Sequence, residues 1–176
     1  ALWAEVVEAI APHGLAALSG STHDVGVVGY VTGGGLSWLG RQYGLAANHV
    51  RRFEVVTADG EIRTASPESE PDLFWALRGG SGNFAVVTHI EIDLFEIAEL
   101  HAGIAIWDGE HAAEILRRWR DWTLTAPETV TTSARVLQLP PLPDIPEPLR
   151  ARPLVAVDGA ALGGEAEALE LLGPLR

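Results

Sequence analysis

The chain has 176 residues and is acidic, with 24 Asp and Glu against 12 Lys and Arg and a formal net charge of −12. A charge of this sign argues against binding nucleic acid or an anionic membrane through the overall field. The sequence contains no cysteine, which excludes disulfides, thiolate metal sites and a cysteinyl bond to a flavin, and its apolar runs are far shorter than the ~18 residues of a membrane span.

The first 18 residues predict a helix and a short strand. Apolar residues recur at helical spacing from Leu2 to Ile10, so we expect a helix over residues 1–12, with Gly14 as its cap. Residues 15–18 are apolar and predict a short strand. The chain begins within a predicted helix and ends just after another one, so we interpret it as an internal segment of a longer protein.

Residues 20–44 form the glycine-rich stretch on which the rest of our interpretation depends. Glycine permits positive φ and close backbone approach, so we expect a packed loop with N–H groups facing an anion, rather than regular helix or strand. We expect a short helix over residues 36–43, its N-terminus facing the loop. Before the closing Gly44, the glycines of this stretch are Gly20, Gly26, Gly29, Gly33, Gly34, Gly35 and Gly40.

Two common nucleotide-binding motifs do not fit this stretch. A P-loop requires Lys-Ser or Lys-Thr after its last glycine, and Leu36 and Ser37 follow Gly35 here. A dinucleotide fingerprint that starts at Gly33 would place its third glycine at Trp38. A purely structural glycine-rich turn stays open as an alternative.

The next segment predicts a sheet with one helix. Asp59-Gly60 lies between two β-rich runs and predicts a hairpin over residues 50–65. A helix is expected over Pro71–Leu77, followed by a second glycine loop over residues 79–83. The strand expected over residues 84–96 places Phe84, Val86, Ile90, Ile92 and Leu94 on one face.

A boundary is expected near residues 97–100, after which a new unit begins. Its proline-rich stretch, residues 140–153, is interpreted as an ordered loop rather than a polyproline ligand. Trp75, Trp119 and Trp122 have the spacing of packed helical residues. The expected elements are strands over residues 101–107, 130–139 and 154–157 and helices over residues 109–123 and 165–172.

Three ordered segments carry a resemblance to a known family. They are VGVVGYVTGGGLSWLGRQYGL (residues 25–45), FEVVTADGE (53–61) and DLFWALRGGSGNFAVVT (72–88). Together they resemble FAD-linked oxidases of the vanillyl-alcohol-oxidase superfamily with a PCMH-type FAD-binding domain, closest to the berberine-bridge-enzyme-like subgroup. A weaker resemblance runs over residues 107–172.

The resemblance implies an α+β fold. Residues 1–98 would form the second subdomain of the PCMH-type FAD-binding domain, an antiparallel or mixed sheet with flanking helices. Residues 99–176 would form the start of an α+β substrate domain. The other FAD subdomain and the rest of the substrate domain, which usually holds the catalytic base, would lie outside this chain. No catalytic residue is therefore assigned.

The same resemblance implies which residues contact FAD. Thr22 stands where members with two covalent flavin bonds have cysteine, so at most one bond is expected. Tyr30 stands where many members have histidine near the pyrimidine edge of the flavin. Asn48-His49 replaces a usual Asp-Asn pair, and Ala85 replaces a usual glycine. The implied cofactor-binding residues are Thr22, Val25, Gly26, Gly29, Tyr30, Gly33, Gly34, Gly35, Gly82, Asn83, Val86 and Val87.

The function implied is that of an FAD-dependent oxidoreductase. It would take hydride from a C–H that bears an alcohol, amine or sugar hydroxyl, with O2 as re-oxidant, and this segment alone would be inactive. The expected partner is a small-molecule substrate, with no nucleic acid or membrane, and a cytoplasmic location is expected. No metal is expected, because the six histidines lack ligand spacing. The alternatives are a flavin-free, non-catalytic remnant or another nucleotide-binding module.

Overall fold

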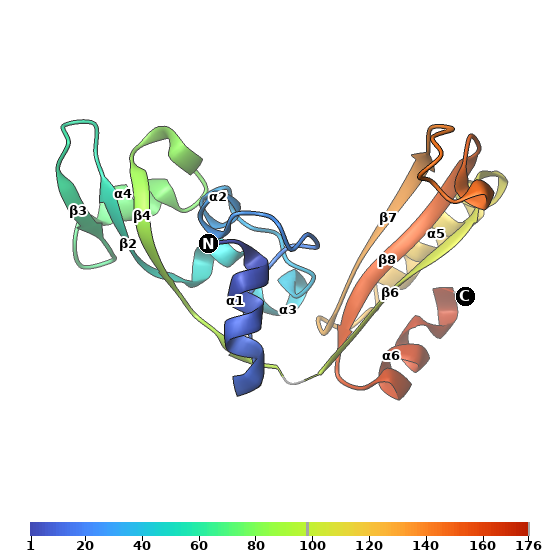
Figure 1. Ribbon diagram of the computed structural model, residues 1–176. Coiled ribbons are helices and arrows are strands. Elements are labelled where there is room, and N and C mark those ends of the chain that lie inside the picture. Colours follow the sequence, from blue (N-terminus) through green and yellow to red (C-terminus); the bar gives the residue numbers. More distant parts are fainter. Residues whose placement is uncertain (98, 176) are drawn as a thin grey trace. The chain divides into compact units, whose positions relative to one another are not determined.

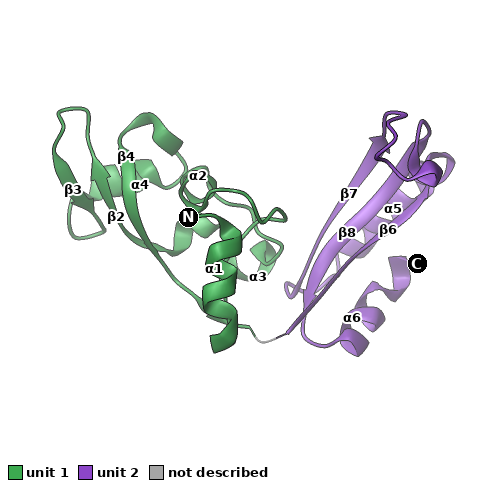
Figure 2. Cartoon of the chain, viewed as in Figure 1, with its two compact units in different colours: residues 1–98 green, residues 99–176 purple. Residues whose placement is uncertain are grey.

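The computed structural model describes residues 1–97 and 99–175. The chain forms two compact units, residues 1–98 and residues 99–176 (Figure 2). Each unit combines helices with antiparallel strands (Figure 1). The α+β class is therefore confirmed, whereas the assignment of the units to an FAD-binding subdomain and a substrate domain stays a prediction.

The first unit contains two antiparallel sheets, one of three strands in the order β3-β2-β4 and one in which β1 pairs with β5. Single turns of 3-10 helix lie between several of its elements. The helices and strands are α1 (Trp3–Ile10), β1 (Leu15–Ala16), α2 (Val27–Thr32), α3 (Gly40–Tyr43), β2 (Val50–Val56), β3 (Ile62–Ala65), α4 (Pro71–Leu77), β4 (Val86–Ile92) and β5 (Phe95–Glu96).

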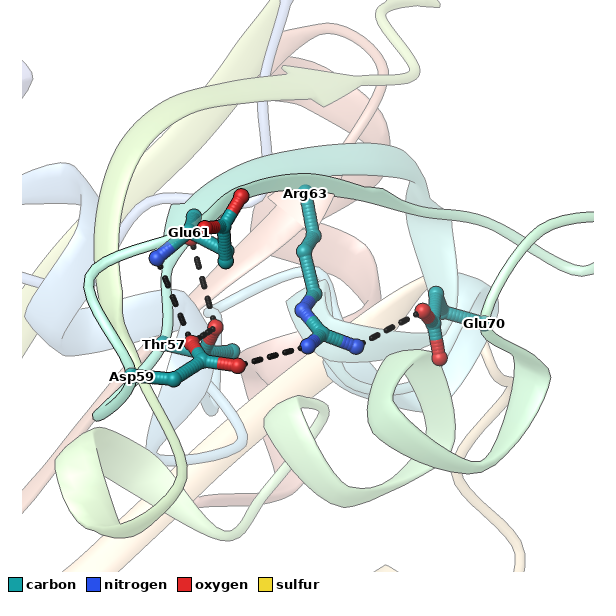
Figure 3. Close-up of polar contacts among 5 residues, drawn as sticks. All are labelled: Thr57, Asp59, Glu61, Arg63 and Glu70. Atoms are coloured by element: carbon teal, nitrogen blue, oxygen red, sulfur yellow. Dashed lines mark hydrogen bonds and ion pairs between the residues drawn. The ribbon is translucent and has the colours of Figure 1, made fainter.

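The hairpin of β2 and β3 is confirmed, and its turn is held by a cluster of polar side chains (Figure 3). The Asp59 carboxylate accepts hydrogen bonds from the Thr57 hydroxyl at 2.5 Å, the Glu61 N–H at 3.2 Å and Arg63 at 2.7 Å. These bonds, that of Thr57 first, lower the pKa of Asp59 to about 2. Arg63 also pairs with Glu70 at 3.1 Å, which ties the hairpin to the start of α4.

Two buried clusters hold the first unit together. Phe53 of β2 is fully buried against Phe74 of α4, with 6.0 Å between the ring centroids, and Leu77 of α4 is fully buried as well. Trp3 of α1 and Val31 of α2 are buried as well. The burial of α2 explains why it forms in spite of its glycine content.

The helix α2 corrects our expectation that residues 20–44 avoid regular structure. Val27 and Val31 lie one turn apart and are 4% and 0% exposed, and the Thr32 hydroxyl donates to the Val28 carbonyl at 2.8 Å. Packing therefore outweighs the helix penalty of about 1 kcal/mol for Gly29. The expected helix over residues 36–43 was also wrong at its start, because α3 begins only at Gly40.

Two expectations about buried side chains in this unit were wrong. Trp75 is 74% exposed, so it is not a core residue. Val86 is 69% exposed because Thr88 forms a bulge: Glu54 pairs with His89, whereas the next residue of β2 pairs with Val87. The bulge shifts the alternation by one residue, so that Val87 replaces Val86 on the inward face.

The second unit is a three-stranded antiparallel sheet in the order β6-β8-β7, with two helices. Val155 and Val157 of β8 pack against Ile115 of α5 and Leu175, and Trp119 and Trp122 join this cluster as expected. The elements are β6 (Leu100–Asp108), α5 (Ala112–Thr123), β7 (Val130–Gln138), β8 (Pro153–Leu162) and α6 (Glu165–Leu172).

The proline-rich stretch is an ordered loop, as expected. It contains a 3-10 turn over Glu147–Leu149, and the Arg150 guanidinium donates hydrogen bonds to the carbonyls of Pro143, at 2.6 Å, and Ile145. A loop bonded to itself in this way differs from an extended polyproline segment, which has no internal hydrogen bonds.

The strand β8 is longer than expected, because it continues through Asp158 and Gly159, a pair typical of turns. Asp158 accepts a hydrogen bond from the Ser133 hydroxyl at 2.9 Å and pairs with Arg135, both on β7. A Cβ at Gly159 would lie 2.4 Å from the Thr131 carbonyl oxygen. Glycine is thus required here by the close approach of two strands.

We expect Gly159→Ala to lower the free energy of unfolding by about 1–3 kcal/mol, because the added methyl group overlaps backbone that cannot easily move. Gly103→Ala is the matched control: Gly103 lies opposite Gly159 on β6, and a Cβ there meets no described atom within 4 Å. Chemical denaturation of both variants checks this, and equal losses would contradict it.

Candidate functional site

The glycine-rich stretch runs through α2 and then turns sharply. Gly26 lies before the first helical residue, and after Gly33 the chain enters positive φ at Gly34, 109°, and Gly35, 70°. The carbonyls of Gly34 and Gly35 accept hydrogen bonds from the N–H groups of Ala47 and Ala46, at 3.0 and 2.9 Å. The triple glycine is therefore fixed in place and is not a mobile loop.

The glycines of this stretch serve two different purposes. Gly20 and Gly35 make room for a ring, because a Cβ at either would lie 3.0 and 2.9 Å from Tyr30. At Gly26, Gly29 and Gly34, a Cβ would meet no described atom within 4 Å. Bare backbone facing open space is the arrangement that a ligand lying close to the main chain needs.

Tyr30 of α2 carries a polar group that the described part of the chain leaves without a partner. Its ring lies edge-on to Trp3, with centroids 5.5 Å apart. The Tyr30 hydroxyl is buried and makes no hydrogen bond to any described residue, and the same holds for Nε1 of Trp3. Burial raises the pKa of Tyr30 to about 12, so the phenol is neutral and can donate.

A buried donor without an acceptor is costly and needs an explanation, and a bound ligand is one. The Tyr30 hydroxyl and the open backbone at Gly29 come from the same short helix, and Gly26 is the residue just before it. The residues present therefore fit a cofactor that brings a hydrogen-bond acceptor and lies against glycine backbone.

The second glycine loop lies beside the first. The Gly79 N–H, at a φ of 121°, donates to the carbonyl of Thr32 at the end of α2, at 2.8 Å. The 3-10 turn Ser81–Asn83 contacts α2 and is closed by a hydrogen bond of 2.6 Å from the Asn83 side chain to the Gly80 carbonyl. Residues about 50 positions apart in sequence thus meet at one place.

The remaining candidate residues lie outside α2, the triple glycine and the second glycine loop. Thr22 lines a pocket of about 370 Å³ with Trp3 and Gly20. The Val25 carbonyl accepts a hydrogen bond of 3.0 Å from the Trp3 N–H. Val86 is exposed at the start of β4, and Val87 is partly buried. Whether each of these residues contacts a cofactor stays a prediction.

Sequence reasoning missed one feature of this site and wrongly expected another. Trp3, which contributes an unpartnered indole N–H, looked like an ordinary apolar helix residue, and no pattern around it indicates otherwise. The anion-binding helix N-terminus expected beside the triple glycine is absent, since α3 begins five residues after Gly35 and is only four residues long.

The described residues contain neither a metal-binding cluster nor a membrane-spanning helix. Within them, no three His, Cys, Asp or Glu side chains cluster in a way that could hold a metal ion. None of the helices in the same residues has both the length and the apolar character needed to cross a membrane.

Two glycine loops that meet at the end of α2, with a buried hydroxyl on the same helix that has no partner among the described residues, suit the binding of a cofactor or nucleotide. Comparison with known proteins specifies the class. A family model described as an FAD binding domain matches residues 1–66. An uncharacterized FAD-linked oxidoreductase of Arthroderma benhamiae is 40% identical over 121 residues, 68% of this chain and 24% of that protein.

Two further proteins agree with this class. An FAD-dependent monooxygenase of Penicillium roqueforti is 32% identical over 124 residues, 70% of this chain and 24% of that protein. The solved structure of 6-hydroxy-D-nicotine oxidase from Arthrobacter nicotinovorans is 30% identical, with a TM-score of 0.83 over 99% of this chain and 37% of that one.

Residues 1–66 thus match an FAD binding domain, the relatives that the chain resembles are FAD-linked or FAD-dependent oxidoreductases, and FAD is the cofactor of this domain. Berberine-bridge-enzyme-like proteins share the fold, with a TM-score of 0.80 at 21% identity. The chain spans 24% of the length of the two curated relatives named above.

Proposed function

We propose that this chain supplies one side of the FAD site of an oxidoreductase that takes hydride from a C–H bearing an alcohol, amine or sugar hydroxyl. The observation that carries the proposal is the buried Tyr30 hydroxyl on α2, which has no partner among the described residues, together with open space at the backbone of Gly29 in the same helix and of Gly26 just before it. The names of the relatives support oxidation chemistry in general, and O2 is our proposal for the re-oxidant.

The chain's own residues would act by binding and by electrostatics. FAD, when bound, supplies the hydride-accepting chemistry. Tyr30 is held by Trp3 and Gly35, so its hydroxyl is positioned in advance to donate to an oxygen on which negative charge develops. Gly29 and Gly34 would let the backbone approach the cofactor, and the packed α2 would keep water away from it.

The whole flavoprotein tests this proposal. After purification it should be yellow, with flavin absorbance bands that bleach anaerobically with a substrate of the proposed class and return with O2 as hydrogen peroxide forms. A colourless protein that binds neither FAD nor another nucleotide would favour the non-catalytic remnant. Affinity for ATP or NAD in place of FAD would favour a different nucleotide-binding module.

Tyr30→Phe in the whole flavoprotein should slow flavin reduction by about tenfold or more, because it removes one donor to developing charge. Flavin occupancy should stay high, and the free energy of unfolding should not fall, since within the described chain the hydroxyl bonds to nothing. Stopped-flow reduction kinetics measure the effect.

Tyr43→Phe is the matched control, because Tyr43 is the second of the chain's two tyrosines and packs its ring on Phe95 at 4.4 Å. An equal slowing in both variants, or no slowing in Tyr30→Phe, would remove Tyr30 from the proposed role.

A further inference from the structure

A second pocket lies in the first unit, away from every residue assigned to the flavin. Its volume is about 650 Å³, and it is formed by α4, the start of β2 and the loop before α4. Trp75 comes from α4 and Arg78 follows the last residue of that helix. Asn48 lies just before β2, Arg51 is in β2, and Glu68 is in the loop. The pocket therefore has apolar and charged walls.

Arg78 brings an uncompensated positive charge to this pocket. Its guanidinium carbon lies 4.3 Å from the centroid of the Phe74 ring, and its Nε is buried without a hydrogen bond. No carboxylate of the described residues forms an ion pair with it. Of the three guanidinium nitrogens of Arg78, only Nε is buried without a hydrogen bond. An anion would therefore approach the two terminal nitrogens.

Trp75 provides a flat apolar surface three residues before Arg78, and both side chains line the same pocket. Its side chain is 74% exposed although tryptophan usually buries most of its area. Asn48 also lines the pocket. A planar ring against the indole would bury apolar area and leave its polar substituent near Arg78 and Asn48.

The other charged groups limit what the pocket can accept. Arg51 is neutralised by Asp93, with 2.5 Å between Nε and Oδ1. The Glu68 carboxylate, which accepts a hydrogen bond of 3.0 Å from the Ser66 hydroxyl, adds a negative charge to the loop wall. With a net charge of −12 on the chain, a ligand with several negative charges is disfavoured.

We propose that this pocket binds a small aromatic monocarboxylate, with the carboxylate on Arg78 and the ring on Trp75. The proposal does not depend on the flavin site, since the two share no residue. It assigns the exposed Trp75 and the unpaired Arg78 to recognition of one ligand.

Benzoate is the probe, titrated into the 176-residue chain by calorimetry and by NMR of the indole N–H signals. We expect one saturable site with a dissociation constant of about 1 mM or tighter, and a shift of the Trp75 signal. Acetate, which lacks the ring, and benzylamine, which reverses the charge, should each bind at least about tenfold more weakly.

Variants separate the two parts of the recognition. Trp75→Ala and Arg78→Gln should each weaken benzoate binding by about tenfold, and Glu68→Gln should strengthen it severalfold because it removes a like charge. Arg120→Gln is the matched control, since Arg120 pairs with Asp121 on α5 and lines no part of this pocket.

The proposal is overturned if benzoate shows no saturable binding up to about 10 mM, or if acetate binds as tightly as benzoate. It is also overturned if the Trp75 signal does not move. Should Arg78→Gln prove unstable by circular dichroism, Trp75→Ala still decides, because the exposed Trp75 side chain contributes little to the core.

Discussion

Gly29→Leu in the whole flavoprotein is expected to lower flavin affinity by at least about tenfold without weakening the fold. Gly29 lies in the middle of α2, its φ is not positive, and a Cβ there meets no described atom within 4 Å. Leucine favours helix over glycine by about 0.8–1 kcal/mol, so the unit itself should tolerate the change or gain from it. The added side chain would occupy the space that we assign to the cofactor.

Gly29 is a better position for this test than Gly34, which has a φ of 109°. Any other residue at Gly34 would be strained with or without a bound ligand. The measurement is flavin content after purification, together with thermal unfolding. Gly173→Leu serves as the control, because Gly173 also has open space around a built Cβ and lies outside the candidate site. A Gly29→Leu protein with full flavin occupancy would mean that α2 does not face the cofactor.

The 176-residue chain by itself is expected to hold FAD weakly, with a dissociation constant well above about 1 μM. The candidate residues Gly26, Gly29 and Gly33 are all exposed, so the chain offers a surface and not an enclosure. A half-site cannot bury the flavin ring, and binding loses most of its apolar contribution.

A fluorescence titration of the purified chain with FAD measures this directly. Size-exclusion chromatography should accompany the titration. Ile104 and Val136 are 56% and 57% exposed, and exposed apolar side chains promote self-association. Saturable binding at or below the micromolar range would show that this chain is sufficient, and would contradict the idea of a site shared with another part of the protein.

The elements that are bounded by proline or glycine residues could be predicted from sequence. The helix α4 has the predicted bounds, because Pro71 suits a first helical position and Gly79 adopts a φ of 121° just beyond its end. The hairpin followed from Asp59-Gly60, where Gly60 has a φ of 83°. In each case, one or two residues at fixed positions relative to the element determine where the helix ends or the hairpin turns.

Elements that depend on distant packing could not be predicted in the same way. The helix α2 exists because Val27 and Val31 are buried, and β8 extends because both of its neighbours pair with it through Gly159. Considered alone, the glycines argue against a helix at α2 and against the extension of β8. Thr88, which forms the bulge in β4, has no sequence signal that would reveal the shift of Val86 to the exposed face.

The candidate site likewise has features that the sequence could predict and features that depend on distant packing. Resemblance of sequence pointed to Tyr30 and the triple glycine, but only the structure shows that the Tyr30 hydroxyl is buried with no partner among residues 1–97 and 99–175. That state depends on Trp3, Gly20 and Gly35, which meet the ring from three separate segments. Which glycines face open space and which face Tyr30 likewise depends on tertiary packing.

Hydrogen exchange of the whole flavoprotein, compared with and without FAD, tests the central claim most directly. Our account predicts slower exchange on flavin loading in residues 26–35 and 79–87, the two glycine loops that meet at the end of α2. The hairpin over residues 57–65, which holds no candidate residue, should be unchanged. Protection confined to other parts of the protein, with both glycine loops exchanging as before, would contradict the account.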